Sequence, residues 1–130
     1  MTPGRFERET SWRRKFAGAL SGLQRGVRGE SSFFVHGFAT AAVLAVALIA
    51  RGVNHIDWCL LILCIGGVLA AEMFNSSIER LARALEDEYN ADLGEALDVA
   101  SAAVLIAALT AAAVGLIVLG RSLGGLFGFW

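Results

Sequence analysis

Three apolar segments, at residues 33–50, 58–78 and 99–119, constrain this fold more than any other feature of the chain. A helix of about 20 apolar residues is long enough to cross the hydrocarbon of a bilayer. The single proline is at position 3, so no later residue interrupts a helix by removing a backbone donor. The sequence therefore predicts an all-α integral membrane protein of one domain, residues 1–130, with three transmembrane helices.

The residues before the first apolar segment predict a helix on the membrane surface. Apolar side chains recur at helical spacing between residues 11 and 29, and basic side chains occupy other parts of the helical wheel. Trp and Phe on the apolar side suit the boundary between hydrocarbon and water. We therefore expect residues 1–29 to form a cytoplasmic surface segment. The apolar positions are Trp12, Phe16, Ala19, Leu20 and Leu23.

Basic residues predict the orientation in the membrane. Seven of the eleven Lys and Arg residues precede position 30, and a segment rich in acidic residues, 79–98, carries two more. Because basic loops stay in the cytoplasm, we expect the N-terminus and the 79–98 linker there, and the 51–57 loop and C-terminus outside. The apolar segments that follow at once favour a bacterial cytoplasmic membrane protein over a nucleic-acid-binding one.

Polar residues close the second apolar segment. Glu72, Asn75, Ser76 and Glu79 share one helical face, because steps of three, four and seven residues return to nearly the same angle. A charged group inside a membrane costs a few kcal/mol even on lenient insertion scales. The stripe therefore needs a partner, and an ion is the natural one.

The other two apolar segments each bring a carboxylate to the same predicted depth. Glu30 precedes the first segment, and Asp98 precedes the third. Carboxylate oxygens gathered at one level suit Mg²⁺, which commonly binds together with nucleotide phosphates. The alternative is that these residues are contacts between helices or solvated helix ends.

The stripe resembles a known signature. Glu72-x-x-Asn75-Ser-Ser-Ile-Glu79 is similar to the motif of the prokaryotic diacylglycerol and undecaprenol kinases, which are small membrane lipid kinases. The resemblance covers residues 12–120. It also includes the segments Glu30-x-x-Phe-x-x-His36, Asp87-Glu-Tyr89 and Asp98-Val-Ala-Ser-Ala-Ala-Val-Leu105.

This resemblance implies a homotrimer in which neighbouring subunits share the active sites. It also implies ATP- and Mg²⁺-dependent phosphorylation of a lipid hydroxyl, with diacylglycerol as the expected substrate and undecaprenol as the alternative. Glu72 would be the general base, Glu30 and Glu79 would hold Mg²⁺, and Asn75 and Asp98 would orient substrate or phosphate. We also expect nucleotide contacts at Arg13, Arg14, Lys15 and Asp98. His36, near the start of the first apolar segment, is expected to line the lipid pocket, and the alternative is that it packs against a neighbouring helix.

The sequence departs from the family pattern at Leu97, where a basic residue usually precedes Asp98. Ser32 and Asn90 are two further departures. The loss of a positive charge leaves open a membrane protein that binds nucleotide or divalent ions without turnover. A proton-coupled transporter is disfavoured, because its acids would form a path across the membrane, whereas these cluster at one depth.

Overall fold

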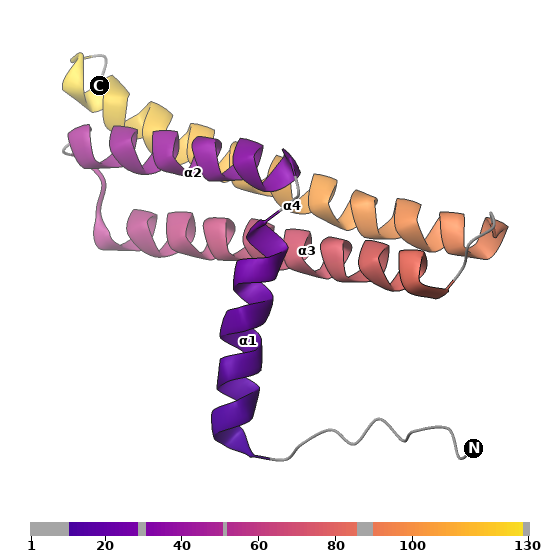
Figure 1. Cartoon of the computed structure of the whole chain (residues 1–130). Helices are drawn as coiled ribbons and strands as arrows, with labels where there is room; N and C mark the ends of the chain where they lie inside the picture. The colour runs from indigo at the N-terminus through magenta and orange to yellow at the C-terminus, as the bar shows by residue number, and fades with distance from the viewer. Residues whose placement is uncertain (1–10, 29–30, 51, 86–89, 129–130) are drawn as a thin grey trace, which may run out of the picture.

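The computed structural model describes residues 11–28, 31–50, 52–85 and 90–128, and within them the regular structure is helical throughout. The helices are α1 (Trp12–Val27), α2 (Ser31–Ile49), α3 (His55–Leu85) and α4 (Ala91–Leu126) (Figure 1). The predicted all-α class is confirmed. The expected surface helix corresponds to α1, and the first apolar segment corresponds to α2.

Helices α3 and α4 extend well beyond the apolar segments predicted for them. They contain 31 and 36 residues, so most of the expected 79–98 linker is helical; residues 86–89 lie outside the described parts. Asn90 caps α4, because its side-chain oxygen accepts from the backbone N–H groups of Asp92 and Leu93. A 36-residue helix is about 54 Å long, whereas the hydrocarbon of a bilayer is about 30 Å thick.

Helices α2, α3 and α4 lie alongside one another, and α1 projects away from them, with only its C-terminal end next to α3 (Figure 1). Most of the contacts between helices are made by α3 with α4, and these two helices are antiparallel. The small buried core contains Ala47, Leu61 and Val118, one residue from each of these three helices. Beyond the point where α1 meets α3, α3 and α4 continue as a pair on the side away from most of α2 (Figure 1).

The outer surface of this bundle is apolar. By length and composition α3 and α4 can each cross a membrane, and α2 contains a shorter apolar stretch, Phe33–Ile49. Large exposed apolar surfaces mark contact with lipid or with other protein. The exposed side chains occur on all three helices and include Phe34, Phe38, Ile62, Phe74, Leu109 and Leu116.

Polar contacts close the end of the bundle at the α2–α3 turn. Asn54 and Asp57 cap α3 reciprocally, since each side chain accepts the other residue's backbone N–H at 3.0 Å. The buried Asp57 carboxylate also pairs with the Arg121 guanidinium of α4. Ser122 Oγ donates to the carbonyl of Ala50 at 3.1 Å. We call Ala50, Asn54, Asp57, Arg121 and Ser122 the turn cluster.

The C-terminal end of α1 is attached to α3. Arg80 Nη2 donates to the carbonyl of Arg25 at 2.5 Å, which satisfies one of the acceptors that a helix end leaves free. Gly26 is buried there against the side chain of Met73, which occupies the space that a Cβ would need. The apolar residues of α1 are exposed, as expected for a helix lying on a membrane surface.

Candidate active site

Four polar side chains on α3 form the predicted stripe, which we call the α3 polar face: Glu72, Asn75, Ser76 and Glu79. Glu72 is 2% exposed and Ser76 is 3% exposed, although each carries a polar group. Asn75 Nδ2 donates to Glu79 Oε1 at 2.9 Å, one helical turn away. The structure thus brings the predicted residues of this stripe together on one side of α3.

His36 reaches the polar face from α2. Its Nε2 atom lies 2.8 Å from Oε1 of Glu72, and its side chain is 23% exposed. The distance is that of an ion pair, but the contact does not have the geometry of a hydrogen bond. The His36 assignment from sequence concerned a lipid pocket, and the structure adds this contact with the candidate base.

Three buried polar atoms of the α3 polar face have no hydrogen-bond partner in the described parts of the chain. They are Glu72 Oε1, Asn75 Oδ1 and Ser76 Oγ. A buried polar group without a partner costs about 1–3 kcal/mol, more when it is charged. Two of these atoms are acceptors and the third is a hydroxyl, so together they suit a ligand that carries both donors and acceptors.

An apolar cleft of about 600 Å³ between α2, α3 and α4 leads to this face. His36 lies at the end of the cleft nearest Glu72, and the rest of the wall is almost entirely hydrocarbon. A cavity of this kind accepts an apolar chain and orients it through the few polar groups at one end. Its lining includes Val43, Val46, Leu61, Val68, Ala108 and Gly115.

The carboxylate of Glu79 has two partners on its own helix. Oε1 accepts from Asn75, and Oε2 lies 3.7 Å from Arg83 Nη1. The described residues contain no group of three His, Cys, Asp or Glu side chains that could hold a metal ion, and Glu30 lies outside them. Even so, the side-chain oxygens of Glu79 and Asn75 are ligands that fit Mg²⁺, which usually binds one or two carboxylates, substrate phosphates and water.

Asp98 lies on α4, exposed, toward the end of the polar face that carries Glu79. The Asp57–Arg121 pair fixes how the antiparallel helices α3 and α4 are aligned. Asp98 precedes Arg121 by as many residues as Arg80 follows Asp57, so Asp98 lies level with Arg80. At 1.5 Å per residue, this level is about 12 Å beyond Glu72. Asp98 therefore lies level with Glu79, which carries the carboxylate at the far end of the polar face. The expected common depth of the carboxylates from all three apolar segments stays a prediction, because Glu30 lies outside the described residues.

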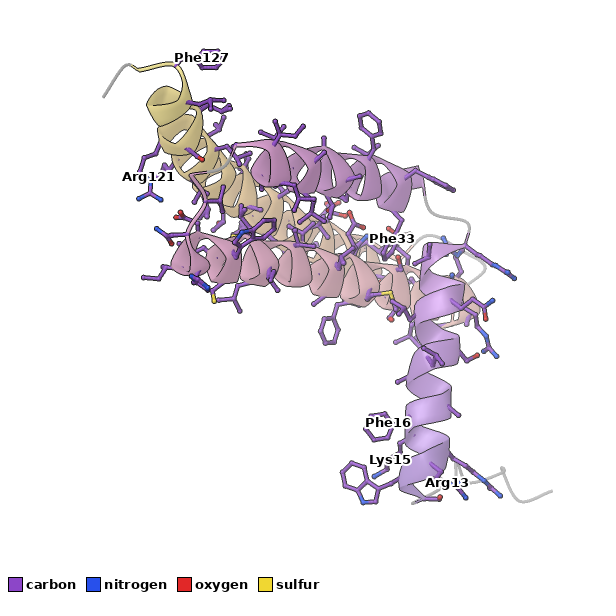
Figure 2. All side chains as sticks on the ribbon, turned by 90° about the vertical axis from the view of Figure 1, so that its left-hand side faces the viewer. Arg13, Lys15, Phe16, Phe33, Arg121 and Phe127 are labelled. Carbon is purple, nitrogen blue, oxygen red and sulfur yellow. The ribbon has the colours of Figure 1, made fainter. Side chains whose placement is uncertain are left out.

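The basic residues assigned to the nucleotide are distant from Glu72 within one chain. Arg13 and Lys15 lie at the free end of α1, far from the α2–α4 bundle (Figure 2). Arg14 is exposed between them, and Lys15 Nζ lies 5.0 Å from the centre of the Trp12 ring. A single chain therefore does not bring these residues together with the α3 polar face.

Leu97 is half-buried near the same level as Arg80. Arg80 and Arg83 lie near this level on α3, and both already have partners. Arg80 donates to the Arg25 carbonyl, and Arg83 pairs with Glu79. In this arrangement, Arg83 places its positive charge beside the polar face through Glu79, while Arg80 is used to hold α1.

Sequence reasoning missed two features of the site. The contact between His36 and Glu72 depends on the register of α2 against α3, which no local pattern specifies. The burial of the Ser76 hydroxyl without a hydrogen-bond partner was also missed, although Ser76 was placed on the same face as Glu72. Helical periodicity carried the only signal, since Ser76 lies four residues after Glu72 and Ser77 does not share that face.

Comparison with known proteins shows the family of this chain. The family model for prokaryotic diacylglycerol kinase matches residues 17–119. A curated undecaprenol kinase of Bacillus subtilis (strain 168) is 29% identical over 105 residues, covering 81% of this chain and 85% of that protein. The matched region contains α2, α3, the polar face and most of α4. The chain is therefore a member of the prokaryotic diacylglycerol kinase family of membrane lipid kinases.

Proposed function

We propose that this protein transfers the γ-phosphoryl group of ATP, with Mg²⁺, to the hydroxyl of a membrane lipid alcohol, and that Glu72 is the general base. The observation that supports this most strongly is the buried Glu72 carboxylate, whose Oε1 has no hydrogen-bond donor in the described parts of the chain. It lies where the apolar cleft ends, so a lipid tail in the cleft would carry its hydroxyl to this oxygen.

In the proposed reaction the lipid oxygen attacks the γ-phosphorus and forms a new P–O bond. The bond between the γ-phosphorus and the β,γ-bridging oxygen breaks, and ADP leaves with that oxygen. The proton of the lipid hydroxyl passes to Glu72. Positioning and charge neutralisation supply most of the catalysis in phosphoryl transfer, so the surrounding residues act chiefly by holding the reactants in line.

Glu79, together with Glu30, would hold Mg²⁺. When bound, the ion would neutralise charge on the phosphates of the nucleotide. Asn75 supports this assignment, because its amide nitrogen fixes one oxygen of Glu79 while its own oxygen stays unpartnered. Asp98, level with the Glu79 end, would orient the nucleotide side.

Trimeric assembly is part of the proposal. Arg13, Arg14 and Lys15 are too far from Glu72 in one chain, so a nucleotide contact by these residues requires the site of a neighbouring subunit. The many exposed apolar side chains and the small residues of α4 would allow close helix packing between chains. The N-terminus would lie in the bacterial cytoplasm, where ATP is available.

Diacylglycerol and undecaprenol are the two candidate acceptors. The first follows from the signature, and the second is favoured by the name of the Bacillus relative. Both offer a hydroxyl on an apolar body, which is what the cleft and the polar face would bind. His36 would lie at the boundary between the lipid hydroxyl and its tail.

The decisive experiment measures transfer of labelled phosphate from ATP to a panel of lipid alcohols in liposomes. We expect diacylglycerol or undecaprenol to be phosphorylated at a higher kcat/KM than the other lipid alcohols of the panel, and Glu72→Gln to lower the transfer about 10³-fold. A wild-type protein that binds Mg-ATP but labels no lipid alcohol would overturn the proposed function. Leu97→Lys belongs in the same panel, since an added positive charge at this level should lower the KM for ATP if the site lacks a cation.

A further inference from the structure

Ser76 and Ser77 are adjacent residues whose side chains have opposite surroundings. Ser77 is exposed, and its Oγ donates to the carbonyl of Met73 at 2.8 Å, the usual bond of a serine inside a helix. Ser76 is 3% exposed, and its Oγ has no hydrogen-bond partner in the described parts of the chain. The buried hydroxyl is therefore the one that is left available for a ligand.

The position of Ser76 along α3 indicates which part of the reaction its hydroxyl can reach. The apolar cleft contacts α3 from Leu61 to Val68, and Glu72 follows one turn later. Ser76 is a further turn along, about 6 Å farther from the cleft, and Glu79 follows it. A phosphoryl group in transit between a lipid hydroxyl at Glu72 and a nucleotide at Glu79 would lie at the level of Ser76.

The chemistry of the three unpartnered atoms agrees with this order. Glu72 Oε1 and Asn75 Oδ1 are acceptors, so neither can donate to a phosphoryl oxygen. The hydroxyl of Ser76 is the donor among them. A donor fixed in a site that excludes water stabilises charge on phosphoryl oxygens more strongly than the same donor in water.

We infer that Ser76 is a further catalytic residue of this protein, whose Oγ–H donates a hydrogen bond to a non-bridging oxygen of the phosphoryl group during transfer. This inference rests on the proposed function. It assigns Ser76 to the transferred group, and so it differs from a role in binding the lipid tail or in packing α3.

The test compares Ser76→Ala with the matched control Ser77→Ala in the full-length protein in liposomes. We expect Ser76→Ala to lower kcat by about 10²-fold or more, as for loss of one oxyanion-hole donor, with the KM for lipid unchanged. We expect Ser77→Ala to keep the wild-type kcat. Ser76→Cys, which keeps the shape but is a weak donor, should fall between wild type and Ser76→Ala.

Two further measurements separate a catalytic role from a structural one. Sulfur accepts hydrogen bonds poorly, so replacing ATP by ATPγS should slow the wild type by a larger factor than Ser76→Ala. The midpoint of thermal unfolding of Ser76→Ala should equal or exceed that of wild type, because the substitution removes a buried hydroxyl without a partner.

Equal kcat in the two alanine variants would overturn the inference, as would a fall in the unfolding midpoint that parallels the loss of activity. A raised KM for lipid at unchanged kcat would overturn it in favour of a lipid contact. If the wild type itself phosphorylates no lipid alcohol, the proposed function is overturned. If the wild type is active and Ser76→Ala has the same kcat, only the role of Ser76 is overturned.

Discussion

The two polar regions of the bundle differ in how completely their hydrogen bonds are satisfied. In the turn cluster, the carboxylate of Asp57 has partners in the α2–α3 turn and on α4, and Ser122 donates across to Ala50. In the α3 polar face, Glu72, Asn75 and Ser76 each keep one buried atom without a hydrogen-bond partner in the described parts of the chain. One region fastens helices together, and the other keeps polar groups available for a ligand, at a cost in stability.

Glu72→Gln should give the largest effect. The amide keeps the size of the side chain but cannot accept the lipid proton, so we expect phosphate transfer to fall by about 10³-fold, within the range for loss of a general base. The unfolding midpoint should not fall, because a neutral amide is easier to bury than a carboxylate. Transfer of labelled phosphate and a thermal melt in detergent measure the two quantities. A stable variant with near-wild-type activity would contradict the assignment.

Substitutions of His36 should show a smaller loss of activity that depends on the reach of the new side chain. Gln places an amide near the position of the imidazole Nε2, whereas Asn is too short and Leu has no polar atom. We expect His36→Leu and His36→Asn to lower kcat by about 10- to 100-fold, as in loss of a group that positions a catalytic residue. His36→Gln should retain most of it. If His36→Leu keeps full activity, the Glu72 contact has no role in turnover.

Asp57→Asn changes an acid to an amide in the turn cluster, as Glu72→Gln does in the α3 polar face. It removes the ion pair with Arg121, whose side chain is 54% exposed, and keeps an acceptor for the Asn54 N–H. We expect the free energy of unfolding to fall by about 1–2 kcal/mol, since solvent screens the half-exposed partner. Activity per folded protein should remain at the wild-type level. Loss of activity without loss of stability would show that the two regions are coupled.

Ser122→Ala should have the smallest effect. It removes one buried hydrogen bond between the end of α4 and the carbonyl of Ala50, and leaves that carbonyl without this donor. Such a bond contributes about 1 kcal/mol. Titration of the purified protein with denaturing detergent measures the change. An unchanged midpoint would mean that another donor replaces the serine, and Ser122→Thr, which keeps the hydroxyl, is the control.

The helices themselves were predictable, because long apolar segments without proline leave little alternative to membrane-spanning helices. The face shared by Glu72, Asn75 and Glu79 was also predictable, since helical periodicity depends only on spacing along one element. The continuation of α3 and α4 through the acidic segment was not expected. Acidic residues mark the end of hydrocarbon, but they do not end a helix.

Contacts between helices were beyond the reach of the sequence. The pairing of His36 with Glu72 and of Asp57 with Arg121 depends on how α2 and α4 are registered against α3, which is decided by packing of residues such as Ala47, Leu61 and Val118. The level of Asp98 along α3 depends on the same register. A position at the edge of an apolar segment does not fix the height of a residue along a neighbouring helix.

The length of α4 has a consequence for how two unlike substrates meet. ATP dissolves in water and a lipid alcohol dissolves in hydrocarbon, so a soluble enzyme would have to extract one of them from its own solvent. A helix of about 54 Å exceeds the hydrocarbon by about 24 Å, and α3 accompanies it beyond α1 (Figure 1). Helices α3 and α4 are therefore long enough to extend from the hydrocarbon into the water beside it. Each reactant can reach these two helices without leaving the solvent in which it dissolves.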